Sequence, residues 1–473
     1  MDKKVAFFAH NYIVAHAKQQ TQQHQQQQQE SERWRKYYLS IKKNFDSINF
    51  DLVKRNKNGE VVSVSLTMEN LKKVLLHIKH ELPAYNNMLH KHDYPAAIKG
   101  EDSKNAYITR LKDLLIQLNF TKTELLGEYM RALAVENQFH PVKKWLESDT
   151  WDKKLRVNKV FNSIVTTLDK NIKEIILKKW FYQIFAAIYD EKYKNEEIAL
   201  ENVLVLSGRQ GIGKTRWFRS LLPVKKSIIT GFFLDLKSKD SQLNALSSLI
   251  VELSELEATF RKSDIEEIKA FLSKTVDEIR RPYAAEAVEM KRRTVFAATV
   301  NSAQFLNDPT GNRRFFVIPV KKITPLSELF NNDEYEIKQF WLELLYMFNR
   351  EHEQLKVNYQ QFRPLHILTN EEFEMVNKAN AEHINLNALA ESFLHMFYDS
   401  SGNLKAKVIS ACGKIKVLPH ENMLTIKQIL FVLGAENAAP ADIKWLRSYI
   451  AEMLNAGTKR TKRGIAYALP AKI

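Results

Sequence analysis

Eight consecutive residues near the middle of the chain form its clearest chemical pattern, a glycine-rich run that ends in lysine and threonine. The run fits G-x-x-x-x-G-K-[ST], follows the apolar stretch 203–206 and precedes a helical pattern. Glycines let backbone amides face phosphate oxygens, and the start of the following helix adds a positive dipole. We therefore predict a site for ATP and Mg²⁺ in which the nucleotide contacts Gly208, Arg209, Gln210, Gly211, Ile212, Gly213, Lys214 and Thr215.

Two of these residues, and acids farther along the chain, have distinct expected roles. Lys214 should reach the β- and γ-phosphates, and Thr215 should offer its hydroxyl oxygen to Mg²⁺. A carboxylate at the end of a neighbouring strand should complete the metal shell, and a second should activate the attacking water. The run 248–257 is an apolar strand followed by acids, so we assign Glu252 to the metal and Glu255 to the water. The reverse order stays open, with Glu257 as a third candidate.

Polar residues after the next apolar run suggest groups that sense and complete the site. Asn301 ends the run 293–301 and could hydrogen-bond the γ-phosphate or the attacking water. Arg313 and Arg314 follow a Gly-Asn turn and precede a strand, which places them to be exposed at a subunit edge. An arginine there would stabilise charge on a neighbour's γ-phosphate, and the pattern does not decide between the two.

The charge of +16 points to an anionic partner, and it is unevenly spread. Residues 401–473 hold 12 basic and 4 acidic groups. Within them, four residues of a basic turn are expected to bind duplex DNA: Lys459, Arg460, Lys462 and Arg463. A second cluster, expected at the tip of a hairpin that contacts single-stranded DNA, consists of Lys291, Arg292 and Arg293.

The elements that must position these residues divide the chain into five parts. Short apolar runs at 203–206, 249–253, 295–299 and 315–320 alternate with helices, which indicates an α/β core with a parallel sheet. In the tail, two helices at 426–433 and 443–456, a basic turn at 457–463 and a strand at 465–469 have the order of a winged helix. The expected parts are a flexible glutamine-rich leader 1–33, a helical region 34–198, an ATPase core 199–325, a helical lid 326–415 and a winged-helix-like domain 416–473.

Composition excludes several classes of protein. The hydrophobic share of 45% excludes wholesale disorder, and the single cysteine excludes a disulfide framework or a cysteine-rich zinc site. No apolar run approaches the ~20 residues that span a bilayer. We therefore expect a cytoplasmic protein without a membrane partner.

The order of the motifs over about two fifths of the chain resembles the virulence-associated protein E family, P-loop ATPases of phages and genomic islands similar to superfamily 3 helicases. The resemblance implies an AAA+-like core that assembles with itself into a ring, expected to be a hexamer, on single-stranded DNA. One departure is that such proteins usually have adjacent acids, whereas Leu253 and Ser254 separate Glu252 from Glu255. The matching segments are 136–142, 145–152, 206–215, 250–256, 261–263, 268–273, 277–283, 299–301 and 306–315.

Three functions are compatible with these features. The first is a replicative DNA helicase of a mobile genetic element, driven by ATP hydrolysis. The second is a DNA-binding regulator or defence ATPase that is switched by ATP and assembles without unwinding. The third, a small-molecule P-loop kinase, is disfavoured because it needs neither Asn301 nor the paired arginines nor the basic ends.

Overall fold

The structure, a computed structural model of the chain, forms two compact units, Met1–Phe139 and His140–Ile473, each of which is described by itself. Of the expected leader 1–33, only Glu32 lies within the described residues. These are 48–79, 82–94, 103–189, 198–254, 265–279, 288–301, 314–357, 364–380, 388–405, 407–409, 415–417, 423–462 and 464–473, together with Glu32, Leu39, Leu306, His383 and Leu386.

The first unit contains strands as well as the predicted helices. Helix α2 (Met68–Lys79) buries Leu71, Val74 and Leu75, which recur at the helical spacing expected from the sequence. This helix packs with α3 (Ser103–Gln117) and α4 (Leu126–Glu136) around one hydrophobic core. The strands have two to five residues, too few for clear alternation, so the sequence did not reveal them. They form the sheets β1 (Val53–Arg55)–β2 (Val61–Ser65)–β5 (Phe120–Thr121) and β4 (Lys91–Asp93)–β3 (Ala84–Asn86)–β6 (Gln138–Phe139).

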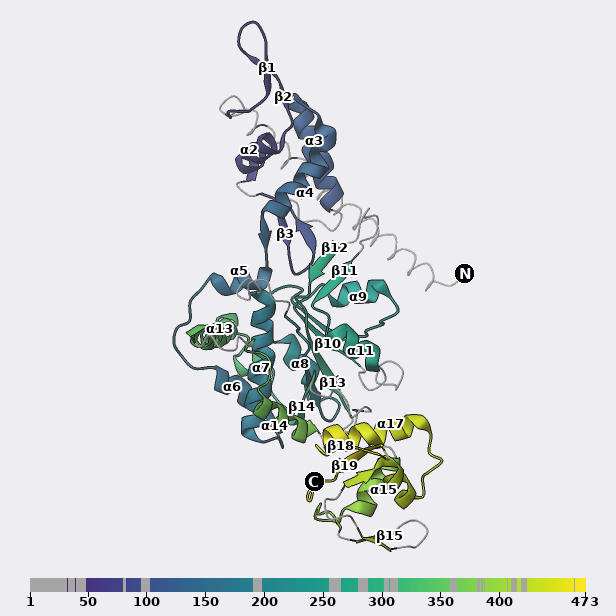
Figure 1. Cartoon of the computed structure of the whole chain (residues 1–473). Coiled ribbons are helices and arrows are strands. Elements are labelled where there is room, and N and C mark those ends of the chain that lie inside the picture. Colours follow the sequence, from purple (N-terminus) through teal and green to yellow (C-terminus); the bar gives the residue numbers. More distant parts are fainter. Residues whose placement is uncertain are drawn as a thin grey trace, which may run out of the picture. The chain divides into compact units, whose positions relative to one another are not determined.

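The second unit is built on a six-stranded sheet, seen at the centre of Figure 1. All four predicted strands are present, and five neighbouring strands run parallel. Two strands were missed: β9 (Ile228–Phe232) is a half-exposed edge strand containing glycine, and β7 (Ile164–Thr166) is a short strand antiparallel to β14 (Phe315–Ile323). The order across the sheet is β7 (Ile164–Thr166), β14 (Phe315–Ile323), β8 (Val203–Ser207), β13 (Val295–Val300), β10 (Ile250–Leu253) and β9 (Ile228–Phe232).

Helices cover both faces of this sheet, as Figure 1 shows. On one face, side chains of β8, β13 and β10 join a hydrophobic cluster with α9 (Lys239–Ala245) and α11 (Ile265–Leu272). On the other face lies α7 (Lys170–Ile188), where the indole of Trp180 donates to the carbonyl of Phe296 at 2.9 Å. Helices α13 (Glu334–Val357) and α14 (Asn370–Asn380) pack against α7. No helix in the described part of the chain combines the length and the apolar composition that crossing a membrane requires.

These contacts change the predicted boundaries. The helical region 34–198 is divided at 139/140, because β7 pairs with β14 and α7 covers the sheet. An ionic contact also joins 149–157 to α13: the Arg156 guanidinium binds both Asp152, at 2.8 Å, and Glu336, at 2.7 Å. Residues 140–189 therefore belong to the same unit as the sheet.

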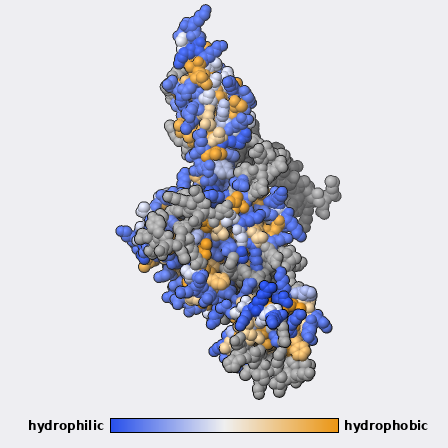
Figure 2. Space-filling view, viewed as in Figure 1, coloured by the Kyte–Doolittle hydropathy of each residue, from blue (hydrophilic) through white to orange (hydrophobic). Residues whose placement is uncertain are grey.

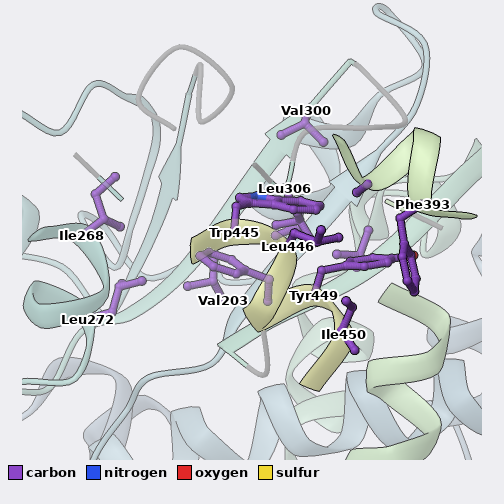
Figure 3. Close-up of a cluster of buried hydrophobic side chains, with 14 of the residues drawn as sticks. Val203, Ile268, Leu272, Val300, Leu306, Phe393, Trp445, Leu446, Tyr449 and Ile450 are labelled. Atoms are coloured by element: carbon purple, nitrogen blue, oxygen red, sulfur yellow. The ribbon is translucent and has the colours of Figure 1, made fainter. Parts of the chain in front are cut away.

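The C-terminal module begins earlier than residue 416, since α15 (Ala388–Phe397) packs against α16 (Ile426–Leu433) and α17 (Pro440–Ser448). Figure 3 shows Phe393 of α15 beside Leu446 of α17 and beside Tyr449 and Ile450 of the π-helical segment Tyr449–Met453 that follows it. The bounds of α16 are those predicted, fixed by a capping box at Thr425 and a left-handed glycine, Gly434. A three-stranded sheet completes the module in the order β17 (Met423–Thr425), β19 (Gly464–Ala468), β18 (Gly457–Thr461). The expected basic turn is thus mostly strand β18, whose five exposed residues give no apolar alternation.

Candidate functional site

The glycine-rich loop leaves the end of β8 and enters the short helix α8 (Lys214–Arg219). Gly208 has a φ of +150°, and a Cβ atom at this residue would lie 2.6 Å from the carbonyl oxygen of Val320. Its amide donates to the carbonyl of Val300 at 3.1 Å. The loop is therefore held between the end of β13 and Val320 of β14, and only glycine fits its first position.

Lys214 connects this loop to the end of β13. Its side chain is buried, and its Nζ donates to the carbonyls of Gly208 and Arg209, the latter at 3.0 Å. The same ammonium lies 3.2 Å from Oδ1 of Asn301. Because β13 is the direct neighbour of β8, the residue after β13 reaches the loop. The structure thus brings Lys214 and Asn301 together.

Glu252, near the end of β10, is completely buried. Its Oε1 accepts hydrogen bonds from the hydroxyls of Thr215, at 3.2 Å, and Thr299, at 2.6 Å, while its Oε2 accepts from the Gly231 amide at 2.6 Å. Contrary to expectation, the acid strand is not the direct neighbour of the loop strand, because β13 lies between them. Thr299 was overlooked as a functional residue, although strand alternation places it on the same side of β13 as Asn301.

The oxygen atoms of Thr215 and Glu252 suit Mg²⁺. Among the described residues, no three His, Cys, Asp or Glu side chains form a group that could hold a metal ion by themselves. Mg²⁺ does not need such a group, since it is commonly held by one or two protein oxygens together with substrate phosphates. A hydroxyl and a carboxylate oxygen 3.2 Å apart beside the glycine-rich loop fit this pattern. Their assignment to metal stays a prediction.

The predicted cationic cluster 291–293 does not form a hairpin tip. Strands β11 (Val276–Ile279) and β12 (Val288–Lys291) do pair as an antiparallel hairpin, but these cations lie at its base. Arg292 is buried: its guanidinium binds both oxygens of Asp277, at 2.6 and 2.8 Å, and lies over the ring of Phe271 at 4.3 Å. The exposure expected of Arg292 is therefore not found, whereas Lys291 is exposed and Arg293 is partly exposed. DNA contact by these residues stays a prediction.

Arg314 also departs from expectation. Its side chain is only 14% exposed, and its Nε lies 3.0 Å from both the Glu201 carboxylate and the Ser273 hydroxyl. It precedes Phe315, which pairs with Val203 at the start of β8, so it lies at the sheet edge opposite the glycine-rich loop. Its expected exposure is not found, and its role toward a neighbouring subunit stays a prediction.

Several predicted residues lie outside the part of the chain that the structure describes, and their roles stay predictions. They are Glu255, Glu257, Arg313 and Arg463.

The C-terminal module presents cations on two elements. On and just after β18, Lys459, Arg460 and Lys462 are exposed. Helix α17 adds Lys444 and Arg447, which are exposed and three residues apart, so they share one face of the helix. Sequence reasoning missed this pair. The apolar residues beside it are buried and therefore mark the inner face, which leaves Lys444 and Arg447 on the exposed face; they are Trp445, Leu446, Tyr449 and Ile450. Figure 2 shows strongly hydrophilic residues on this module.

Comparison with known proteins gives one family match. The profile described as "Virulence-associated protein E-like domain" matches residues 146–385. No curated protein matches the chain significantly.

Three solved apo structures of the C-terminal region of NrS-1 are similar to this chain, with 16%, 13% and 14% sequence identity. The alignments cover 65%, 82% and 83% of this chain and 76%, 96% and 96% of those chains. Their TM-scores are 0.28, 0.31 and 0.30, which are too low to establish a shared fold.

Proposed function

The chain belongs to the virulence-associated protein E-like family, and on that premise we propose that it is an ATP-dependent replicative DNA helicase of a mobile genetic element. The observation that carries the proposal is the convergence of Lys214, Asn301, Thr215 and Glu252 at one edge of a parallel sheet. These four groups come from three different strand ends, and together they match the needs of triphosphate hydrolysis. A cytoplasmic location accords with this role.

The chemistry assigned to each residue follows from its contacts. Lys214 would exchange its bonds to the loop carbonyls for bonds to the β- and γ-phosphates, whose charge attracts the ammonium more strongly. Thr215 and Glu252 would hold Mg²⁺, which neutralises phosphate charge when bound. Asn301, already beside Lys214, would orient the γ-phosphate or the attacking water.

Assembly into a ring would complete each site with an arginine from the neighbouring subunit. Arg314 lies at the sheet edge opposite its own loop, so it could serve only a nucleotide bound by another copy. Arg313, which lies outside the described residues, stays the second candidate for this role. We propose a hexamer of AAA+-like cores on single-stranded DNA.

The C-terminal module would bind duplex DNA as a winged helix. The supporting observation is its order, α15–β15–β16–β17–α16–α17–β18–β19, in which β15 (Lys407–Ile409) and β16 (Ile415–Val417) form a separate hairpin and β19 is in the middle of the three-stranded sheet. In such a fold the second of the two adjacent helices, here α17, approaches a DNA groove, and the final hairpin contacts phosphates. The exposed cations of α17 and β18 suit both contacts.

The site is tested by comparing Lys214→Ala with Arg216→Ala. Both residues lie in α8, but Arg216 is exposed, with a side-chain accessibility of 65%. We expect Lys214→Ala to abolish ATP hydrolysis and Arg216→Ala to retain it. Normal hydrolysis by Lys214→Ala would refute the site assignment.

Motor activity needs a separate assay with a forked duplex. Strand release with ATP, but not with a non-hydrolysable analogue, would support the helicase. DNA-stimulated hydrolysis without strand release would instead support the regulator or defence ATPase. The particle mass with analogue and single-stranded DNA tests the ring, because a stable monomer would contradict it.

A further inference from the structure

The carboxylate of Glu252 is held by donors from three separate elements. Thr215 belongs to α8, Thr299 to β13, and Gly231 to the edge strand β9. Two of these hydrogen bonds are short, at 2.6 Å from the Thr299 hydroxyl and 2.6 Å from the Gly231 amide, whereas Thr215 lies at 3.2 Å. The acid is therefore fixed mainly by Thr299 and Gly231.

The sheet register explains how Thr299 reaches this acid. Glu252 pairs directly with Ala297 on β13, and Thr299 is two residues farther on the same face. Phe296 and Ala298 point to the other face, where they join the hydrophobic cluster with α9 and α11. Because the direct partner is a small alanine, the carboxylate has room to lean toward Thr299 and the loop.

The hydrogen bonds also limit what the carboxylate can do. An ionised carboxylate offers about four acceptor positions, and three are used here. The longest bond, to Thr215, is the easiest to replace by a metal bond. A metal ligand needs a fixed orientation, which the two short bonds provide, and the position now used by Thr215 would then hold the metal rather than a water molecule.

We propose that Thr299 is a positioning residue that orients Glu252 toward Thr215, so that Glu252 serves as a metal ligand and another group activates water. This inference rests on the proposed nucleotide site. It assigns a role to a residue outside the glycine-rich loop, through its hydrogen bond to Glu252. It also decides between the two roles that the sequence left open for Glu252.

The test compares Thr299→Val, which removes the hydroxyl, with Thr299→Ser, which keeps it. Binding of Mn²⁺ is measured by electron paramagnetic resonance in the presence of a non-hydrolysable ATP analogue. We expect Thr299→Val to weaken Mn²⁺ binding by about 10-fold or more, as removal of an outer-shell partner commonly does, and Thr299→Ser to stay near wild type. Binding of the analogue in EDTA should be unchanged in both variants.

Thr294→Val is the matched control. The Thr294 hydroxyl is also buried and donates to the Ser248 carbonyl at 2.7 Å, but it lies just before β13, at the opposite edge of the sheet. Its removal should lower stability without changing Mn²⁺ binding. Equal weakening in Thr294→Val and Thr299→Val would mean a general structural effect and would overturn the inference.

Kinetics provide a second readout. In ATP hydrolysis, Thr299→Val should lower kcat at limiting Mg²⁺ and leave KM for ATP nearly unchanged. At high Mg²⁺, kcat should return toward the wild-type value. If Thr299→Val binds Mn²⁺ as tightly as the wild-type protein, the positioning role is refuted and the proposed function is not. Failure of the wild-type protein to bind Mn²⁺ with the analogue or to hydrolyse ATP would refute the proposed function as well.

Discussion

Replacing Arg292 by alanine should destabilise the unit His140–Ile473 strongly, because it would leave a buried carboxylate without its cation. The Arg292 side chain is 0% exposed and that of Asp277 is 8% exposed, and two hydrogen bonds of 2.6 and 2.8 Å join them. Breaking a buried pair by removing one partner costs about 3–5 kcal/mol. The stacking of the guanidinium on the Phe271 ring would disappear as well, which adds to this cost.

The expected change is large enough to measure by thermal unfolding. At about 2 °C for each kcal/mol, the lower end of the range for large domains, Tm should fall by roughly 6–10 °C. Lys291→Ala is the matched control, since its exposed side chain at the same hairpin base should change Tm little. Adding Asp277→Ala to Arg292→Ala should restore part of the stability, because the unpaired carboxylate is then gone.

The same variants separate a structural role from DNA contact. If Arg292 has only a structural role, the folded fraction of Arg292→Ala should bind single-stranded DNA with the same dependence of log K on log salt concentration as wild type. A variant that unfolds like wild type and shows a shallower slope would refute our reading of the buried pair.

Three further outcomes are expected. The Arg156 guanidinium lowers the pKa of the Asp152 carboxyl from 3.8 to about 2, so its stabilising effect is complete above pH 3.8 and is lost as the pH falls toward 2. The stability difference between wild type and Asp152→Asn, measured by urea unfolding, should therefore shrink between pH 4 and pH 2; a constant difference would contradict this. In assemblies that mix wild-type subunits with Arg313→Ala or Arg314→Ala subunits, the loss of ATPase activity should exceed the fraction of variant subunits. If neither variant gives such a loss, the proposal that an arginine acts on a neighbour's nucleotide is wrong. Replacing the β18 cations by alanine should reduce the salt slope of duplex binding by about 0.9 for each DNA phosphate that the protein no longer neutralises, and an unchanged slope would place the DNA elsewhere.

Local patterns were enough to predict much of the core. The strands β8, β10, β13 and β14 are mostly apolar and mostly buried, as expected of strands covered on both faces, so their existence could be read from the local sequence pattern. The glycine-rich loop was also predictable, since the left-handed φ values of Gly211 and Gly213 and the close approach at Gly208 require glycine. Helix α16 was predicted to the residue because its cap and its terminal glycine are local signals.

What the sequence could not decide depends on contacts between distant residues. Lys291 and Arg292 are adjacent cations, yet Lys291, the last residue of β12, is exposed and Arg292, the next residue, is buried against Asp277 of the paired strand. The extent of the second unit depends on the pairing of β7 with β14, whose residues are about 150 positions apart along the chain.

Short runs of the sequence were enough to predict Lys214, Thr215, Glu252 and Asn301 and the strands β8, β10 and β13 beside them, but not the role of Thr299. The position of β13 between the loop strand and the acid strand became known only from the fold. Strand order is set by which hydrogen-bonding edges meet when the sheet assembles, and no local pattern records it. That order brings Asn301 to Lys214 and Thr299 to Glu252.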